Sequence, residues 1–304
     1  MNRSTMLLAS AGLMGCCLIW GSMTPILKEL TEVMDLWLLS TLRYVLGLPV
    51  LWLAWMLAIR PRHAPKPMQA GQLASLGLAM SAFSVLLTFG VRHSHPVTAA
   101  IVLNTGPVIA TVMAWLLLRA RPAPGFGIAL SLSLSGAALV VIGAPGFAAR
   151  GLGFQGGEPL LLAAQICWQW YSIRAQQWLG DRGQIGLSAI TSTVAGLWMF
   201  AGYAVVFSTG LAGGFPDTIS TLNIFYLVWV CVFGVAVAVL MWNYGVSRLS
   251  LPIASLHMNA APVVTVLTSW ALGRPPTGLQ LLGGVVVLSG IVYMQTRQFA
   301  RARA

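Results

Sequence analysis

Long runs of apolar side chains alternate with short polar connections along almost the whole chain. A hydrocarbon core of about 30 Å is crossed by about 20 helical residues that rise 1.5 Å each. Ten runs reach that length: 6–27, 36–59, 71–91, 96–118, 124–143, 158–179, 186–208, 223–245, 251–272 and 276–296. Because backbone groups inside lipid must be paired within their own segment, each run is predicted to be a helix. We therefore expect an all-α integral membrane protein with ten transmembrane helices.

The ten runs fall five and five around a glycine-rich break at 146–157, and a segment of the first half returns in the second. The copy is shifted by 155 positions without a gap, and its identical pairs are Gly90/Gly245, Val91/Val246, Ala99/Ala254, Asn104/Asn259, Pro107/Pro262, Val108/Val263, Trp115/Trp270, Leu117/Leu272 and Arg119/Arg274. An odd number of spans per half places the second copy upside down in the bilayer, as in the inverted repeats of secondary transporters. We expect a first five-helix repeat at 1–145, a connecting loop at 146–156 and a second repeat at 157–304.

The positive charges are distributed unevenly between the two sides of the predicted bundle. Charged residues make up 8% of the chain and hydrophobic ones 58%, whereas soluble domains carry about 25% charged residues, so lipid is expected to cover most of the surface. The net charge is +11. With a cytoplasmic N-terminus, the inside segments hold Arg3, Arg60, Arg62, Lys66, Arg119, Arg121, Arg174, Arg182, Arg248, Arg297, Arg301 and Arg303, and the outside loops hold Lys28, Arg92, Arg150 and Arg274. This positive-inside bias predicts that both termini are cytoplasmic.

The same bias explains the basic net charge without a nucleic-acid partner. We expect a multi-pass protein of the bacterial cytoplasmic (inner) membrane, whose partners are the lipid bilayer and a small-molecule substrate. One copy of the chain is compatible with this arrangement, and the sequence does not fix the oligomeric state.

Two prolines lie mid-span at matching places, and an asparagine precedes each of them by three positions: the pairs are Asn104–Pro107 and Asn259–Pro262. Each proline removes a backbone N–H and frees the carbonyl four residues earlier, on Leu103 or Met258. In a membrane such breaks persist where side chains, neighbouring helices or cavity water satisfy the freed groups, and Asn104 and Asn259 are placed to do so. Either the helices are kinked around an amide patch, or the amides and loosened turns face a central cavity; the two interpretations are compatible. The expected hinge residues are Gly21, Pro25, Pro107 and Pro262.

Several motifs resemble the EamA-type members of the drug/metabolite transporter superfamily. They are Trp20-Gly21-Ser22 with Pro25 on the first span, Leu42-Arg43-Tyr44 on the second, the duplicated segments 99–107 and 254–262, and the aromatic-rich segments 168–171 and 242–245. The resemblance covers essentially the whole chain, and the layout is similar to YddG-type exporters of aromatic and other amino acids. It implies ten helices, inverted repeats and a central cavity bounded mainly by spans 1, 3, 4, 6, 8 and 9.

One departure from the family pattern concerns the ends of spans 4 and 9. The family commonly has Gly-Glu there, whereas this chain has Leu118-Arg119 and Gly273-Arg274. No role of that acid can be carried over to this protein.

The carboxylates all lie at span ends or in loops: they are Glu29, Glu32, Asp35, Glu158, Asp181 and Asp217. Ion-coupled carriers and exporters of cationic drugs often place a carboxylate near the membrane midplane. The absence of a carboxylate near the midplane of this chain disfavours carboxylate-based proton coupling and a lipophilic cation as substrate. Facilitated diffusion or exchange becomes the default, although His257 or bound water offers another route for a proton.

The candidate substrate-binding residues combine one arginine with aromatic and neutral polar side chains. Arg43, roughly 12 Å from the outer end of its span, either binds a substrate carboxylate or snorkels toward backbone carbonyls. His257 either donates to substrate or packs. Aromatic rings suit amphipathic solutes such as amino acids, with core packing as the alternative. The full set is Trp20, Ser22, Arg43, Asn104, Trp168, Gln169, Tyr171, Trp242, Tyr244, His257 and Asn259.

Motifs for catalysis are missing from the sequence. Lys28 and Lys66 are its only lysines and neither follows a glycine, so no P-loop exists; no G-x-S-x-G or H-E-x-x-H occurs either. We expect no enzyme activity, cofactor or metal. The sequence favours a secondary transporter that exports small metabolites, above all amino acids including aromatic ones, by alternating access through a central cavity. The alternatives are a carrier of another metabolite or drug, a channel-like pore, and a non-transporting membrane scaffold.

Overall fold

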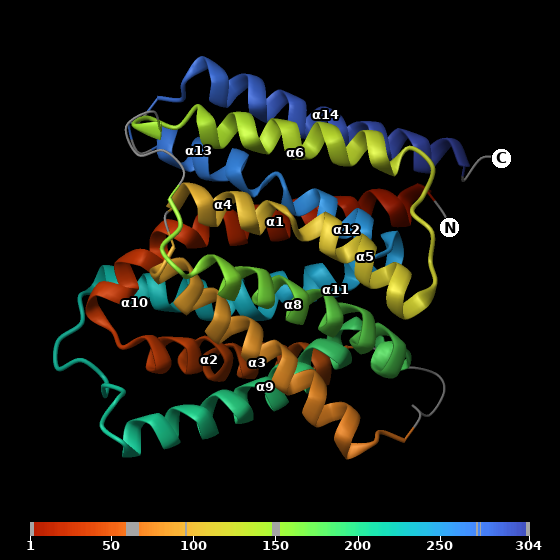
Figure 1. The fold of residues 1–304 in the computed structure, drawn as a ribbon. Coiled ribbons are helices and arrows are strands. Elements are labelled where there is room, and N and C mark those ends of the chain that lie inside the picture. Colours follow the sequence, from red (N-terminus) through yellow and green to blue (C-terminus); the bar gives the residue numbers. More distant parts are fainter. Residues whose placement is uncertain are drawn as a thin grey trace.

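The computed structural model describes residues 3–58, 67–94, 96–147, 153–271, 273 and 275–301, and these form a single bundle of helices (Figure 1). The first half consists of α1 (Arg3–Val33), α2 (Leu36–Leu57), α3 (Ala70–Arg92), α4 (Pro96–Asn104), α5 (Gly106–Leu118) and α6 (Phe126–Ile142). The second half consists of α8 (Glu158–Leu179), the short 3-10 helix η1 (Gly180–Arg182), α9 (Gly183–Ser208), α10 (Thr221–Val228), the π-helix η2 (Trp229–Val237), α11 (Ala238–Leu249), α12 (Leu251–Met258), α13 (Ala261–Ala271) and α14 (Gly278–Arg301).

These helices account for the ten predicted spans. Within the described residues, 8 segments are long and apolar enough to cross a membrane, and one of them, Glu158–Ser208, contains both α8 and α9. The remaining span is α6, a shorter apolar helix. The all-α membrane fold predicted from the apolar runs is therefore confirmed. The predicted boundaries of the two repeats are not tested by the helices alone, and residues 148–152 of the connecting loop lie outside the described residues.

Spans 4 and 9 are each divided in two at the place where the sequence repeats. Span 4 is interrupted between α4 and α5, where the Thr105 N–H donates to the Val102 carbonyl over 3.1 Å. Span 9 is interrupted between α12 and α13, where the Ala260 N–H donates to the His257 carbonyl over 3.0 Å. These two hydrogen bonds are related by the 155-residue shift. The two divided spans run in opposite directions through the bundle (Figure 1), as an inverted repeat requires.

The first span of each half, α1 or α8, packs against a glycine of the third span of the other half. Leu13 of α1 lies against Gly245 of α11, so closely that a Cβ on this glycine would overlap the leucine side chain. Leu161 of α8 lies against Gly90 of α3, where a Cβ would stand 2.7 Å from the leucine Cδ2. Because Gly90 and Gly245 are an identical pair of the sequence repeat, α1 and α8 occupy equivalent places in the two halves.

The helices α6 and α14 lie together at one edge of the bundle (Figure 1). Glycines bring their backbones into contact: a Cβ on Gly136 would stand 2.7 Å from the Gly283 carbonyl oxygen, and a Cβ on Gly290 would stand 2.8 Å from the Ala129 carbonyl oxygen. Small residues allow such close approach in lipid, where van der Waals contact drives helix association. This pair supports the bundle from outside and leaves the centre to the other spans.

One end of the bundle carries both termini (Figure 1). The α5–α6 connection, η1 and the turn between α11 and α12 lie at the same end, which we call the basic end because Arg121, Arg182 and Arg248 are found there. The opposite end holds the connections from α1 to α2 and from α9 to α10. The basic end corresponds to the side that the charge distribution predicts to be cytoplasmic.

Candidate functional site

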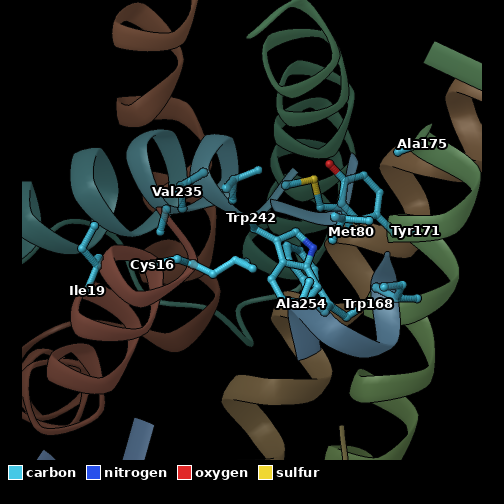
Figure 2. Close-up of a cluster of buried hydrophobic side chains, with 14 of the residues drawn as sticks. Cys16, Ile19, Met80, Trp168, Tyr171, Ala175, Val235, Trp242 and Ala254 are labelled. Carbon is cyan, nitrogen blue, oxygen red and sulfur yellow. The ribbon is translucent and has the colours of Figure 1, made fainter. Parts of the chain in front are cut away.

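Five aromatic rings from four spans meet in the centre of the bundle, and we call them the aromatic cluster: Trp20, Phe83, Trp168, Tyr171 and Trp242. The Trp168 ring lies 5.4 Å from Trp20, 5.7 Å from Trp242, 4.7 Å from Phe83 and 5.3 Å from Tyr171, measured between ring centroids. Trp20 and Trp242 are 5.9 Å apart. Tyr171, Trp168 and Trp242 converge with Met80 and Ala254 in Figure 2. Four of these rings were predicted site residues, and the structure brings them together.

Hydrogen bonds fix the two indoles that contact Trp168, those of Trp20 and Trp242. The Trp20 Nε1–H donates to the Gly234 carbonyl over 2.9 Å, and the Trp242 Nε1–H donates to the Ser172 hydroxyl over 2.9 Å. Ser172 in turn donates to the Trp168 carbonyl one turn earlier on α8. Each indole therefore has a partner for its polar edge while its faces pack against other rings. The arrangement holds the cluster in one geometry between α1, α8 and α11.

The carbonyl that holds Trp20 belongs to the π-helix η2, which sequence reasoning did not predict. The span at 223–245 was expected to be a plain helix, but nine of its residues form π-helical turns. Gly234 is tightly packed there, because a Cβ at this position would stand 2.5 Å from the Met23 sulfur. Irregular turns of this kind are frequent at functional sites. No feature of the apolar sequence Trp229–Val237 marks it in advance.

A chain of polar side chains lies behind the cluster, between α8, α9 and α11. The Asn243 amide donates to the Tyr171 hydroxyl over 3.2 Å and to the Ser188 hydroxyl over 2.9 Å. The Tyr171 and Thr191 hydroxyls are 3.0 Å apart. In a low-dielectric interior such bonds fix side-chain positions strongly, because a lost partner leaves a buried polar group unpaired. Tyr171 is therefore held in place through its hydroxyl group.

A cavity of about 500 Å³ lies at the basic end. Its lining comes from α5, the α5–α6 connection, α8, the start of α9 and the α11–α12 turn. Ser172, the hydroxyl that receives Trp242, is one of the lining residues. The cavity therefore extends from the basic end to Ser172, which is one hydrogen bond away from the Trp242 ring of the aromatic cluster. Its size is within the roughly 300–1,000 Å³ of small-molecule pockets.

The chemistry of this cavity is neutral to positive. Arg121 is the one charged side chain among the described residues that line it. Gln176 and Gln184 also line it and exchange two hydrogen bonds of 2.9 and 3.1 Å between their amides. Gln176 additionally donates to the Asn243 carbonyl over 3.0 Å. This lining offers hydrogen bonds and one positive charge to a solute, and no carboxylate.

The broken span 4 is met by two glutamine side chains of α8. The Gln165 Nε2 atom lies 3.4 Å from the Leu103 carbonyl oxygen, and the Gln169 Nε2 atom lies 3.5 Å from the Gly106 carbonyl oxygen. Gln169 also accepts a hydrogen bond of 3.3 Å from Ser255 of α12. The carbonyl freed before Pro107 is thus satisfied from α8. Asn104 was expected to do this, but its amide donates to Ala100 on its own helix over 2.8 Å.

Asn259, the partner of Asn104 in the repeat, is buried, and its amide nitrogen has no hydrogen-bond partner within the described part of the chain.

The predicted hinge residues lie at or near helix starts and crossings. Pro107 and Pro262 are the second residues of α5 and α13, where proline fits a helix start. Gly21 lies against α13, since a Cβ on it would stand 2.9 Å from the Val264 Cβ. The Pro25 side chain is outside the described residues. Their role as hinges stays a prediction.

Three further predicted residues lie away from the aromatic rings. His257 is fully buried toward α14: its Nδ1–H donates to the Ile253 carbonyl over 2.8 Å, so Nε2 accepts from the Gln295 amide over 3.1 Å. Tyr244 stacks under Arg248, 5.5 Å from the guanidinium carbon to the ring centroid. Ser22 donates to the Ile19 carbonyl over 2.8 Å and accepts from the Trp229 indole over 3.3 Å. These contacts describe packing, and substrate binding by these three residues stays untested.

Arg43 lies on α2, buried between helices with 7% of its surface exposed. Its Nε atom is buried and has no hydrogen-bond partner in the described structure. Four residues later, Gly47 lies against η2, since a Cβ there would stand 2.7 Å from the Cys231 carbonyl oxygen. Residues four apart share a helix face, so Arg43 lies on the face of α2 that packs on η2.

Ser172 and Gln176 of α8 were absent from the predicted set although the sequence carries a signal for them. Gln165, Gln169, Ser172 and Gln176 follow one another at intervals of four, three and four positions on α8. This spacing places all four on one face of a helix, and a polar stripe on a transmembrane helix faces the bundle interior. The stripe would have extended the predicted site from Gln169 to the cavity.

Comparison with known proteins settles the family. A family model described as "EamA-like transporter family" matches the chain twice, over residues 7–142 and over residues 155–296. The chain belongs to the EamA-like transporter family. It is therefore a multi-pass membrane transporter and not an enzyme, as the sequence predicted.

Named relatives of this transporter share about a quarter of its residues. It is 24% identical over 246 residues to a "Probable terminal-alkyne amino-acid exporter" of Streptantibioticus cattleyicolor, covering 80% of this chain and 78% of that protein. It is 22% identical over 213 residues to the "Uncharacterized transporter YyaM" of Bacillus subtilis, covering 69% and 68%. It is 24% identical over 291 residues to the "Uncharacterized transporter YrdR" of the same species, covering 90% and 86%.

One solved structure, described only as "Crystal structure of protein", has the same fold over the full length of both chains. The TM-score is 0.77 and the sequence identity is 16%. At this identity the likeness supports the ten-span architecture and carries no information on the substrate.

Proposed function

We propose that this transporter is a secondary carrier that exports amino acids, aromatic ones among them, from the cytoplasm across the bacterial inner membrane. The basic end would face the cytoplasm, with both termini. The single observation that supports the proposal is the hydrogen bond from Trp242 to Ser172, because Ser172 lines the cavity and thereby links its inner end to the aromatic cluster. A solute entering from the basic end would meet amides, one arginine and then flat apolar rings.

An amino acid matches this succession of surfaces. Its charged groups would find Arg121 and the Gln176–Gln184 amides in the wider part of the cavity. Its side chain would lie against the rings at the inner end, where aromatic faces favour apolar and aromatic groups. A cationic drug has no carboxylate to meet in this cavity, so the lining favours zwitterionic solutes over cations.

Alternating access would then proceed by movement of the two halves, 1–145 and 157–304, about the cluster. The breaks at Pro107 and Pro262 are the proposed bending points, together with Gly21 and Pro25. In the conformation described here the cavity lies on the basic side of the rings, so this conformation is the one proposed to load solute from the cytoplasm. The amino-acid exporter among the relatives supports the substrate class.

Reconstitution into liposomes tests this function. The purified transporter would be given a panel of labelled amino acids, with and without a pH gradient. We expect saturable uptake of several amino acids, the aromatic ones included, in the absence of the gradient. Transport of another metabolite without any amino acid would refute the substrate class, and non-saturable flux would favour a channel.

A further inference from the structure

Within the described part of the chain, Arg43 presents a buried positive charge without a negative partner. The elements packed against α2 include η2, α9 and α3, and no Asp or Glu occurs in the sequence of these three. On α1, Glu29 and Glu32 are exposed, and Asp35 before α2 accepts hydrogen bonds of 2.9 and 3.1 Å from the Trp37 and Leu38 backbone. An arginine stays charged in a protein, and a buried charge without a counter-charge is costly.

The position of Arg43 along the bundle follows from the packing of α2 against η2. α2 and the span α10–η2–α11 both run from the opposite end toward the basic end. Gly47 lies beside Cys231 and Val235 of η2, and Trp20 of the cluster is bonded to Gly234 in the same helix. Arg43 is one turn earlier on α2, or about 6 Å farther from the basic end at 1.5 Å per residue. Along the bundle, the cavity therefore lies toward the basic end, and Arg43 lies toward the opposite end, of the level at which Trp20 is held.

From this geometry we infer that Arg43 is the receptor for the carboxylate of the transported solute after it has passed the aromatic cluster. The inference rests on the proposed function, because it supposes that the solute crosses this cluster. A guanidinium binds a carboxylate through two parallel hydrogen bonds, and the buried Nε of Arg43 is a donor that has no partner among the described residues. The solute would supply the missing negative charge for as long as it is bound.

The inference specifies which part of the solute decides recognition. Arg121 lines the cavity from an exposed connection, where water screens its charge, whereas Arg43 is buried. Charge interactions are much stronger away from water. Recognition of the solute carboxylate should therefore depend on Arg43 more than on Arg121. Recognition of the amino group of the solute should depend on neither arginine.

Competition in proteoliposomes tests this assignment. Uptake of labelled phenylalanine would be inhibited by 3-phenylpropionate, which keeps the carboxylate, and by phenylalaninamide, which lacks it. The wild type should be inhibited by the carboxylate at lower concentration. In R43Q the inhibition constant for 3-phenylpropionate should rise about tenfold or more, since a charged hydrogen-bonded contact is lost, whereas that for phenylalaninamide should stay within about twofold. The inhibition constant of R43K for 3-phenylpropionate should lie between those of the wild type and R43Q.

Two further measurements keep the outcomes distinct. If R43Q transports too little for competition, the thermal shift of the purified variant with each compound reports binding directly, and R43K is compared in the uptake assay. R121Q is the matched arginine variant at the basic end and should keep most of the preference for the carboxylate. An unchanged preference in R43Q, or in R43K if R43Q does not fold, would overturn the assignment. Equal weakening of both compounds would overturn it too, because it indicates a structural role. A wild type that transports no amino acid would instead refute the proposed function.

Discussion

The two broken spans of the repeat are crossed by equivalent helices in different ways. At the break of span 9, α1 lies so close that a Cβ on Gly21 would stand 2.9 Å from the Val264 Cβ and 3.1 Å from the Ala261 carbonyl oxygen. At the break of span 4, α8 keeps more distance and reaches the Leu103 and Gly106 carbonyls with glutamine side chains. Ala261 and Gly106 are related by the 155-residue shift.

This difference separates a packing role from a solute-binding role within one repeated motif. The α1 crossing is tight, and the Thr265 hydroxyl donates a hydrogen bond across it to the Gly21 carbonyl over 3.2 Å. The α8 crossing is polar and continues through Ser172 and Gln176 into the cavity. Duplication has thus kept the backbone arrangement, and the residues at the crossing have diverged. We expect the α8 side to bind solute and the α1 side to hold the halves together.

The largest effect is expected from Trp168 of α8, which touches every other ring of the cluster. Trp168→Ala should lower the free energy of unfolding by about 3–5 kcal/mol, as truncation of a buried tryptophan does, and abolish measurable amino-acid uptake. Trp168→Phe should recover part of the uptake because a ring remains. Trp115→Ala on α5 is the control, because the Trp115 side chain is 51% exposed. It should change neither the free energy of unfolding nor the uptake. Normal uptake by a folded Trp168→Ala protein would remove the cluster from the transport route.

Gly21→Ala tests the tight crossing. The added methyl overlaps Val264 and the Ala261 carbonyl, so the variant should lose about 1–3 kcal/mol of stability, as overpacking does, with a matching fall in the thermal unfolding temperature in detergent. Gly12→Ala on the same helix is the matched control, because nothing lies within 4 Å of its Cβ. Gly12→Ala should leave the free energy of unfolding unchanged or raise it by up to about 1 kcal/mol, because alanine has the higher helix propensity. Equal stability of both variants would mean that α1 does not press on α13.

Gln169→Leu tests the polar crossing. Removal of this amide leaves the Gly106 carbonyl and the Ser255 hydroxyl without their partner, and each such loss costs about 1–3 kcal/mol when buried. We expect a several-fold fall in the rate of amino-acid uptake. Thr265→Val, the corresponding polar change at the α1 crossing, should reduce uptake less than Gln169→Leu. The opposite order would exchange the roles assigned to the two crossings.

The smallest effect is expected at the mouth of the cavity. Arg121→Gln should raise the KM for a zwitterionic amino acid by about two- to threefold at low salt, in keeping with the roughly 1 kcal/mol or less of an exposed charge pair, and the difference should shrink at high salt. Arg248→Gln removes an arginine of the same end that stacks on Tyr244 outside the cavity lining. Its KM should remain unchanged. Identical shifts in both variants would indicate a general surface-charge effect.

Much of the architecture could be predicted from the sequence because lipid imposes simple rules on it. Apolar length predicted the spans, and the repeated Asn-x-x-Pro segments predicted where spans 4 and 9 divide. The partner of the freed Leu103 carbonyl could not be predicted, because Asn104 and Gln165 are both amides within reach of it in principle. Only the packing of α8 against α4 and α5 decides between them.

The predicted residues include four rings of the aromatic cluster and, of the polar stripe on α8, Gln169, whereas Ser172 and Gln176 of that stripe were missed. Trp20, Trp168 and Trp242 were identified by residue type, which persists whatever the exact packing. The π-helix at Trp229–Val237 depends on hydrogen-bond register, which an apolar sequence does not encode visibly. The cavity lining depends on helix ends and connections, whose positions follow from tertiary packing.

Counterflow tests the central claim, that one solute site is exposed to the two sides of the membrane in turn. Proteoliposomes loaded with unlabelled phenylalanine are diluted into a trace of labelled phenylalanine, and the initial rate of label entry is compared with that of empty vesicles. A carrier that alternates about the aromatic cluster predicts faster entry and a transient accumulation of label inside the loaded vesicles. Equal rates in loaded and empty vesicles, with saturable flux in both, would contradict it.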